Sequence, residues 1–242
     1  MGTQIKKFSE IAKGDAVLPS SWDFRAVVND DNLTYFVWNT QTQEGLIVDP
    51  ARDDLEAIEK LLAELKSVRW FAVIDTHTHA DHISSAFELS SKLGVPLLMS
   101  SKSPSTRVQL RVSQEMSLPL KAAPIHFAHT PGHTPDGLLV SWGPFLFTGD
   151  TILYGDTGRD DLPGGDPSAH YESLQVFKKF AKADALVLFG HDSEGGRVTT
   201  WKTQLQMNAS LTQDRETFVR EASAFVGAAP KKLKESLYEN LK

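Results

Sequence analysis

A short histidine-rich stretch constrains this chain more than any other feature of its sequence. Residues 76–82 read Thr-His-Thr-His-Ala-Asp-His, so four side chains that bind metal ions well lie within six positions. They follow the apolar run Trp70–Ile74, which predicts a buried strand. A loop leaving such a strand holds its side chains rigidly, and imidazole and carboxylate groups suit zinc or iron. The stretch therefore predicts a metal site at the end of a strand.

Composition limits both the metal site and the partners. The 242 residues include no cysteine, so a metal would be bound by nitrogen and oxygen atoms. A net charge of −6, with one dense basic stretch at Lys231–Lys234 that we expect to be a solvated helix face, argues against nucleic-acid binding. The chain shows neither a secretory signal pattern nor an apolar run long enough to span a membrane. We expect a cytoplasmic protein without a membrane partner.

Apolar periodicity predicts strands and helices that alternate along the chain. The runs Leu33–Trp38 and Leu46–Asp49 predict a hairpin. Helices are predicted over Asp53–Lys66, Ile83–Leu93 and Ser168–Lys182, and from Thr199 onward; further strands are predicted at Val95–Met99, Ile125–Ala128, Leu138–Trp142, Phe145–Thr148 and Ala185–Phe189. This order predicts an α/β or α+β fold with a helix-covered sheet core. We expect one domain, residues 1–242, with a short helical C-terminal extension from about residue 199.

Four further polar residues follow predicted strands. His133, Asp150 and His191 each come after an apolar run and a glycine, which lets the backbone pass close to a crowded centre. Asp49 ends a strand before Pro50, where it would either orient a metal ligand or cap a turn. The other histidines have no such motif partner, and we expect a structural or solvent-exposed role for His126, His129 and His170.

The chain resembles the metallo-β-lactamase superfamily. The superfamily motif T-H-x-H-x-D-H is unbroken at residues 76–82, and His133, Asp150 and His191 follow in the same order. The resemblance implies an α+β fold, a four-layer αβ/βα sandwich with metal at the edges of its two sheets.

Within that superfamily, the chain is similar to the persulfide dioxygenases. The similar segments are Pro131–Pro135, Phe147–Asp150 and Gly158–Leu162. The resemblance implies one Fe(II) per chain, bound by His77, His133 and Asp150, a 2-His-1-carboxylate set that leaves coordination positions open. It also implies the partners, a small-molecule thiol persulfide such as glutathione persulfide and O₂, which react to give sulfite and free thiol.

The remaining motif residues receive supporting roles from the same resemblance. Five residues would surround the iron or hold a second metal: His79, Asp81, His82, His191 and Asp49. Of these, Asp81 and His191 would act in catalysis. Arg159 would bind a carboxylate of glutathione, or instead pair with Asp160 or Asp161. Two positions depart from the family pattern, since Ser193 replaces a usual tyrosine and Thr157 a common cysteine. The thiol carrier therefore stays open.

Two other classes of function stay open beside the dioxygenase. A dinuclear zinc hydrolase of the glyoxalase II type would use all seven motif residues to hold two Zn(II) ions and would cleave a glutathione thioester. Only about 50 residues follow His191, whereas the glyoxalase II resemblance calls for a longer helical substrate-binding domain there. Lactonase or lactamase activity is a further hydrolase option. A redox or binding protein without turnover is the other class.

Three apolar residues near the C-terminal end could line a homodimer contact or cover the core: Phe218, Phe225 and Leu237.

Overall fold

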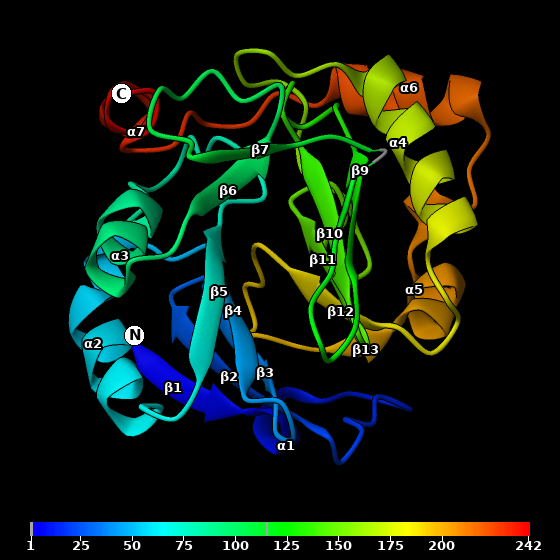
Figure 1. Cartoon of the computed structure of the whole chain (residues 1–242). Helices are drawn as coiled ribbons and strands as arrows, with labels where there is room; N and C mark the ends of the chain where they lie inside the picture. Colours follow the sequence, from blue (N-terminus) through cyan, green and yellow to red (C-terminus); the bar gives the residue numbers. More distant parts are fainter. Residues whose placement is uncertain (1, 115) are drawn as a thin grey trace.

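Two β-sheets packed face to face form the centre of the molecule, and helices cover both outer sides (Figure 1). The computed structural model describes residues 2–114 and 116–242. Helices α2 and α3 lie on the left of Figure 1 and α4, α5 and α6 on the right. The helices are α1 (Phe8–Ile11), α2 (Leu55–Glu64), α3 (Ala86–Leu93), α4 (Pro167–Phe180), α5 (Trp201–Met207), α6 (Arg215–Ala224) and α7 (Leu233–Asn240). This layering confirms the α+β four-layer sandwich.

The first sheet comes from the N-terminal half of the chain. Its strands lie in sequence order: β1 (Gln4–Lys7), β2 (Trp22–Asn29), β3 (Asn32–Asn39), β4 (Glu44–Val48), β5 (Arg69–Ile74), β6 (Leu97–Ser100) and β7 (Leu110–Val112). Strands β1 to β4 pair antiparallel, whereas β4 to β7 pair parallel. Parallel strands end at the same edge, so the segments after β4 and β5 are brought together there.

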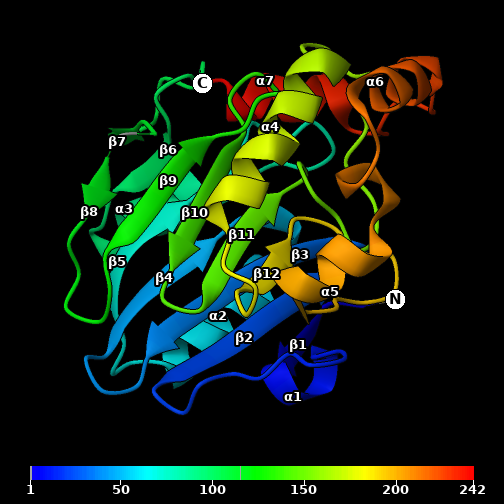
Figure 2. The same ribbon diagram turned by 90° about the vertical axis from the view of Figure 1, so that its right-hand side faces the viewer.

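The second sheet comes from the C-terminal half. Its strand order is β13-β12-β11-β10-β9-β8, with bounds β8 (Ser117–Leu118), β9 (Ile125–His129), β10 (Leu138–Trp142), β11 (Phe145–Gly149), β12 (Leu186–Phe189) and β13 (Thr199–Thr200). Strands β11 and β12 are parallel, and the other neighbours are antiparallel. Figure 2 shows α4 crossing in front of this sheet. The loops after β11 and β12 therefore also share one edge.

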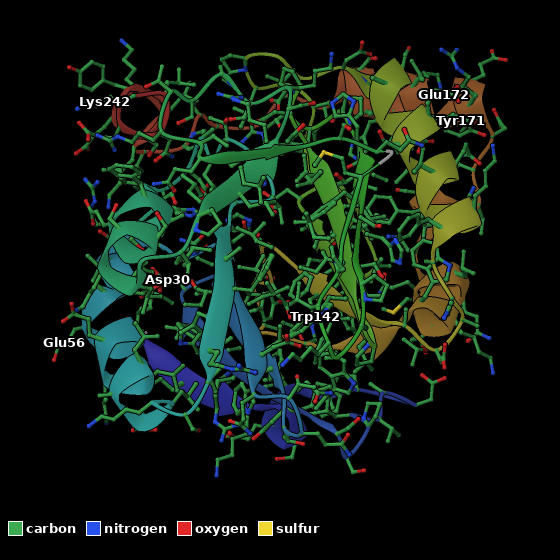
Figure 3. All side chains as sticks on the ribbon, viewed as in Figure 1. Asp30, Glu56, Trp142, Tyr171, Glu172 and Lys242 are labelled. Atoms are coloured by element: carbon green, nitrogen blue, oxygen red, sulfur yellow. The ribbon has the colours of Figure 1, made fainter. Side chains whose placement is uncertain are left out.

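Large aromatic side chains fill the space between the sheets. Trp22 of β2 meets Trp142 of β10 edge to face, with ring centroids 4.7 Å apart. Trp142, labelled in Figure 3, is fully buried, as are Phe24 and Phe145. Such rings bury much apolar area and gain a further 0.5–1.5 kcal/mol, roughly, from edge-to-face geometry. This core fixes how the two sheets sit, and with them the loops at their edges.

Most predicted elements are present, with shifted limits. The hairpin is β3–β4, and the helices at residues 53–66 and 168–182 appear as α2 and α4. The helix predicted from Ile83 begins only at Ala86, because Ser84 bonds to Asp75 and stays in the loop. The region expected to be helical from Thr199 starts instead with β13, which pairs with β12. Helix α1 and the strands β1, β2, β7 and β8 were not predicted. No helix in the described ranges is long and apolar enough to cross a membrane.

Candidate metal centre

The predicted ligands converge at one edge of the two sheets. Residues 75–85 form the loop after β5, and His133 lies in the loop between β9 and β10. Asp150 follows β11 directly, and His191 follows Gly190 after β12. Because each residue leaves the end of a buried strand, its backbone is fixed by the core. The histidine-rich loop thus faces residues of the other sheet.

His77, His133 and Asp150 form the first of the candidate metal sites. All three are buried, and each offers one ligand atom within 4.8 Å of the others. Asp150 Oδ2 lies 3.5 Å from His133 Nε2 and 3.8 Å from His77 Nε2. Two donors that bind one ion at about 2.1 Å each lie at most about 4.2 Å apart. Both Asp150 distances are within that limit and the His77–His133 pair lies within 4.8 Å, so the three side chains are close to the spacing that a single ion needs.

Hydrogen bonds fix the tautomers of both imidazoles. His133 Nδ1 lies 2.6 Å from the carbonyl oxygen of Arg159, which can only accept, so Nδ1 carries the proton. His77 Nδ1 lies 3.0 Å from Thr76 Oγ1, and the Thr76 hydroxyl donates to Asp49 Oδ2 at 2.8 Å. Both rings thereby keep an Nε2 lone pair for a metal. Metal-binding histidines usually have such a partner on the other nitrogen.

Asp49 anchors this chain of hydrogen bonds. Its buried carboxylate also accepts from the Thr76 backbone N–H at 2.7 Å, and its φ of 52° is in the left-handed region. A non-glycine residue adopts that conformation at a cost of about 1 kcal/mol or more, which the surrounding structure must offset. Asp49 is thus placed to orient His77 through Thr76.

The protonation states of His77 and Asp150 suit metal binding. Burial lowers the pKa of His77 to about 3, so its ring is neutral at pH 7. Burial opposes the ionisation of Asp150, but the charge and hydrogen bond of His191 hold its pKa well below the usual range. Burial also opposes protonation of His79, yet its interaction with Asp49, 3.4 Å away, raises its pKa to about 9. Neutral His77 and anionic Asp150 are the forms that bind cations.

A second group of donors lies beside the first. His79, Asp81 and His82 each offer a ligand atom within 4.8 Å of one another. Asp81 Oδ2 lies 2.8 Å from His82 Nδ1 and 3.0 Å from His191 Nε2. His191 Nδ1 in turn lies 2.8 Å from Asp150 Oδ1. His191 therefore bridges the carboxylates of the two groups, and both carboxylates raise its pKa well above the ordinary value against the effect of burial.

The residues present fit a bound cation. Buried ring nitrogens without a hydrogen-bond partner among the described residues gather here: His77 Nε2, His79 Nδ1 and Nε2, and His82 Nε2. Buried polar atoms are rarely left unpaired, and an ion is one of the partners that satisfies them. Two nitrogen ligands and one oxygen ligand, with no thiolate, suit iron or zinc.

Glycines make room around Asp150. A Cβ on Gly190 would lie 2.3 Å from Asp150 Oδ1, and a Cβ on Gly158 would lie 2.1 Å from the Asp150 carbonyl oxygen. Both distances are too short for a real side chain. Gly190, the glycine that precedes His191 in the sequence, therefore allows the close approach of the backbone that was expected there, and Gly158 does the same without having been singled out.

Arg159 takes part in the site through its backbone. Its carbonyl oxygen accepts from His133, whereas its guanidinium pairs bidentately with Asp161 at 2.5 and 2.7 Å. The guanidinium also donates to the Ala228 carbonyl oxygen at 2.7 Å and lies over the ring of Phe225. Of the two roles considered from the sequence, the structure contains the ion pair with Asp161. Substrate binding by Arg159 stays a prediction.

Other polar residues support the loops without joining the candidate metal sites. His170 is fully buried and bonds to Asp160 Oδ1 and to the Thr151 carbonyl oxygen, both at 2.7 Å, which confirms a structural role. His126 is exposed, and His129 bonds to the Pro135 carbonyl oxygen at 2.9 Å.

Asn240 was not identified from the sequence, although its side chain directly contacts the histidine-rich loop at residues 75–85, called the metal loop below. Its side chain donates to the carbonyl oxygens of His79 and His82, both at 2.9 Å, and accepts from the Ser84 N–H at 2.9 Å. Asn240 ends α7, more than 150 positions further along the chain. Periodicity carries no signal for such a distant contact.

The fold and the arrangement of the ligands define a class of protein. The sequence model described as the metallo-beta-lactamase superfamily matches residues 29–191, and this chain belongs to that superfamily. Among solved structures, the crystal structure of ETHE1 from Myxococcus xanthus superposes with a TM-score of 0.83 at 26% identity, covering 90% of this chain and 97% of the other.

More particular similarity is to persulfide dioxygenases. The human mitochondrial persulfide dioxygenase ETHE1 is 27% identical over 190 residues, which cover 78% of this chain and 74% of the human protein. A hydroxyacylglutathione hydrolase of Anaeromyxobacter dehalogenans is 30% identical over 145 residues, covering 60% of this chain and 54% of its own.

Proposed function

We propose that this protein is a non-haem Fe(II) dioxygenase that oxidises a thiol persulfide. The overall reaction converts the persulfide, O₂ and water into the free thiol, sulfite and two protons. The observation that carries the proposal is the convergence of His77, His133 and Asp150, a 2-His-1-carboxylate set with free donor atoms. The similarity to persulfide dioxygenases supports the same reaction.

The residues around the donor set have separable roles in this proposal. A bound Fe(II) would supply redox chemistry and open coordination positions for the persulfide sulfur and O₂. His77, His133 and Asp150 would hold it, while Thr76 and the Arg159 carbonyl oxygen keep both Nδ1 atoms protonated. The hydrogen bonds at the Nδ1 atoms orient both rings, so the Nε2 lone pairs would already point toward a bound ion.

Asp81 and His191 are the residues we assign to proton handling. In its cationic form His191 donates one ring N–H to Asp150 Oδ1 and the other to Asp81 Oδ2. Because both carboxylates favour that form, His191 stores a proton beside the reacting atoms. In this proposal, that proton would neutralise the thiolate released when the sulfur–sulfur bond breaks.

A dinuclear zinc hydrolase is the second candidate function. One observation favours it: His79, Asp81 and His82 form a separate donor group next to the first. In that function the pair of ions would activate a water molecule for attack on a thioester. The similarity to a hydroxyacylglutathione hydrolase is in keeping with this alternative.

Metal analysis and substrate turnover distinguish the two functions. Protein purified without oxygen is expected to contain one iron per chain, to consume O₂ with glutathione persulfide or another thiol persulfide, and to release sulfite. Two zinc ions per chain, with cleavage of S-lactoylglutathione and no oxygen uptake, would replace the dioxygenase with the hydrolase. If the protein retains its metal but shows neither activity, the remaining interpretation is a binding protein.

A further inference from the structure

A cavity of about 350 Å³ opens beside His133, and most of its wall is apolar. The apolar lining includes side chains from the loop after His133, the loop after Asp161, and helix α7 with the residue that follows it: Pro135, Leu162, Pro163, Leu237 and Leu241. The volume is at the lower end of the range for small-molecule sites. Because His133 lines the cavity, the cavity lies next to the candidate metal centre.

Two polar groups in this wall lack partners. Thr134 is 8% exposed, and its buried Oγ1 has no hydrogen-bond partner among the described residues. Lys102 lines the same cavity, and its ammonium group makes no ion pair with any residue that the structure describes. By contrast, both carboxylate oxygens of Asp136 are occupied by Thr78. The unpaired Thr134 hydroxyl lacks the partner that a buried polar group usually has, and the exposed Lys102 ammonium group in the same lining is available to pair with an anion.

The nearby Arg159 does not line this cavity. Arg159 lines a different cavity, of about 260 Å³, with Phe218 and Phe225. Its guanidinium is already paired with Asp161 and the Ala228 carbonyl oxygen. Lys102 is therefore the one cationic side chain among the described residues that line the cavity beside His133.

We propose that this cavity binds a small, largely apolar thiol with one carboxylate, and that such a thiol carries the persulfide sulfur. The inference rests on the proposed function. Lys102 pairs with the carboxylate, Thr134 hydrogen-bonds to it, and the apolar wall covers the hydrocarbon body. Glutathione has two carboxylates and an ammonium group, and this wall offers partners for only part of that charge. Leaving a charge unpaired in an apolar site is costly.

Binding of the product thiols tests the proposal independently of turnover. Isothermal titration under nitrogen would compare 6-mercaptohexanoate, 3-mercaptopropionate, 1-hexanethiol and glutathione. We expect 6-mercaptohexanoate to bind at least about tenfold more tightly than glutathione. It should also bind at least about tenfold more tightly than 3-mercaptopropionate, because each additional buried methylene adds about a fourfold gain.

A matched pair of lysine variants tests the carboxylate contact. Lys102→Met should weaken binding of 6-mercaptohexanoate about tenfold and leave 1-hexanethiol unchanged. Lys121→Met, at another exposed lysine outside the cavity, should change neither. Because Lys102 is exposed, its replacement is expected to leave the fold intact.

The outcomes separate this inference from the proposed function. Glutathione binding as tightly as 6-mercaptohexanoate, or unchanged binding in Lys102→Met, would overturn the assignment of the thiol. Sulfite release from any persulfide would still support a dioxygenase in that case. Conversely, if 6-mercaptohexanoate binds tightly and this binding depends on Lys102, but no persulfide yields sulfite, the assignment of the ligand site would be supported and the dioxygenase function contradicted.

Discussion

His133 and His82 differ in what surrounds their ring nitrogens. His133 keeps Nε2 free while its Nδ1 bonds to a backbone carbonyl oxygen, and it lies in one group with His77 and Asp150. His82 instead bonds through Nδ1 to Asp81 in the neighbouring group. The two histidines therefore belong to different candidate sites.

This difference predicts unequal losses of metal. His133→Ala should abolish iron binding, since one of three ligands is lost, whereas His82→Ala should keep much of it. The measurement is iron per chain after anaerobic reconstitution and gel filtration. Equal loss in the two variants would refute the assignment of a single ion to His77, His133 and Asp150.

The ion pair of Asp161 and Arg159 predicts a pH dependence with a definite sign. The Arg159 hydrogen bond lowers the pKa of Asp161 to about 2, below the usual value of about 3.9. A lowered folded-state pKa stabilises the fold fully above the unfolded value, and this contribution is lost as the pH falls towards 2. The difference in unfolding free energy between the natural protein and Asp161→Asn should be equal at pH 7 and 5 and smaller at pH 3. A difference that grows on acidification would contradict the pairing.

At the scale of elements, contacts that are local in sequence could be predicted and distant ones could not. The strand β5 and its metal-binding loop follow from an apolar run and seven adjacent residues. Strand β2 carries an alternating pattern in Trp22, Phe24 and Ala26 that would have revealed it. The bond from Arg159 to Ala228 joins residues 69 positions apart. Only the folded chain determines such pairs. By contrast, the ion pair of Arg159 with Asp161 joins residues two positions apart, and the sequence already offered it as one of two roles.

Helix α7 provides a prediction at the same scale. Its Asn240 bonds to three backbone groups of the metal loop, so Asn240→Ala should loosen that loop and lower metal affinity about tenfold or more. Lys234→Ala, at an exposed position of the same helix, should have no effect. Competition with a chelator measures both variants. Equal affinities would mean that α7 does not position the loop.

Across the whole molecule, the first candidate site joins the two sheets. His77 follows a strand of the first sheet, whereas His133 and Asp150 follow strands of the second. An ion bound by all three therefore holds the halves of the sandwich together, and its binding energy adds to the energy of folding.

Metal removal should accordingly lower the melting temperature. Free ion at about a thousand times its Kd contributes about 4 kcal/mol, which corresponds to a shift on the order of 10 °C for a chain of this size. Calorimetry before and after chelation measures the shift. His133→Ala should melt at the same temperature with and without metal; a persistent shift in that variant would place the stabilising ion elsewhere.

The close approach of Gly158 and Gly190 to Asp150 has a consequence for how this protein can change over time. Every other amino acid carries the Cβ that these two positions exclude. A library randomised there and selected for iron retention should return glycine, although neither residue has a side chain to offer the ion. In homologues that descend from this chain, the residues that line the substrate cavity can therefore vary far more freely than Gly158 and Gly190.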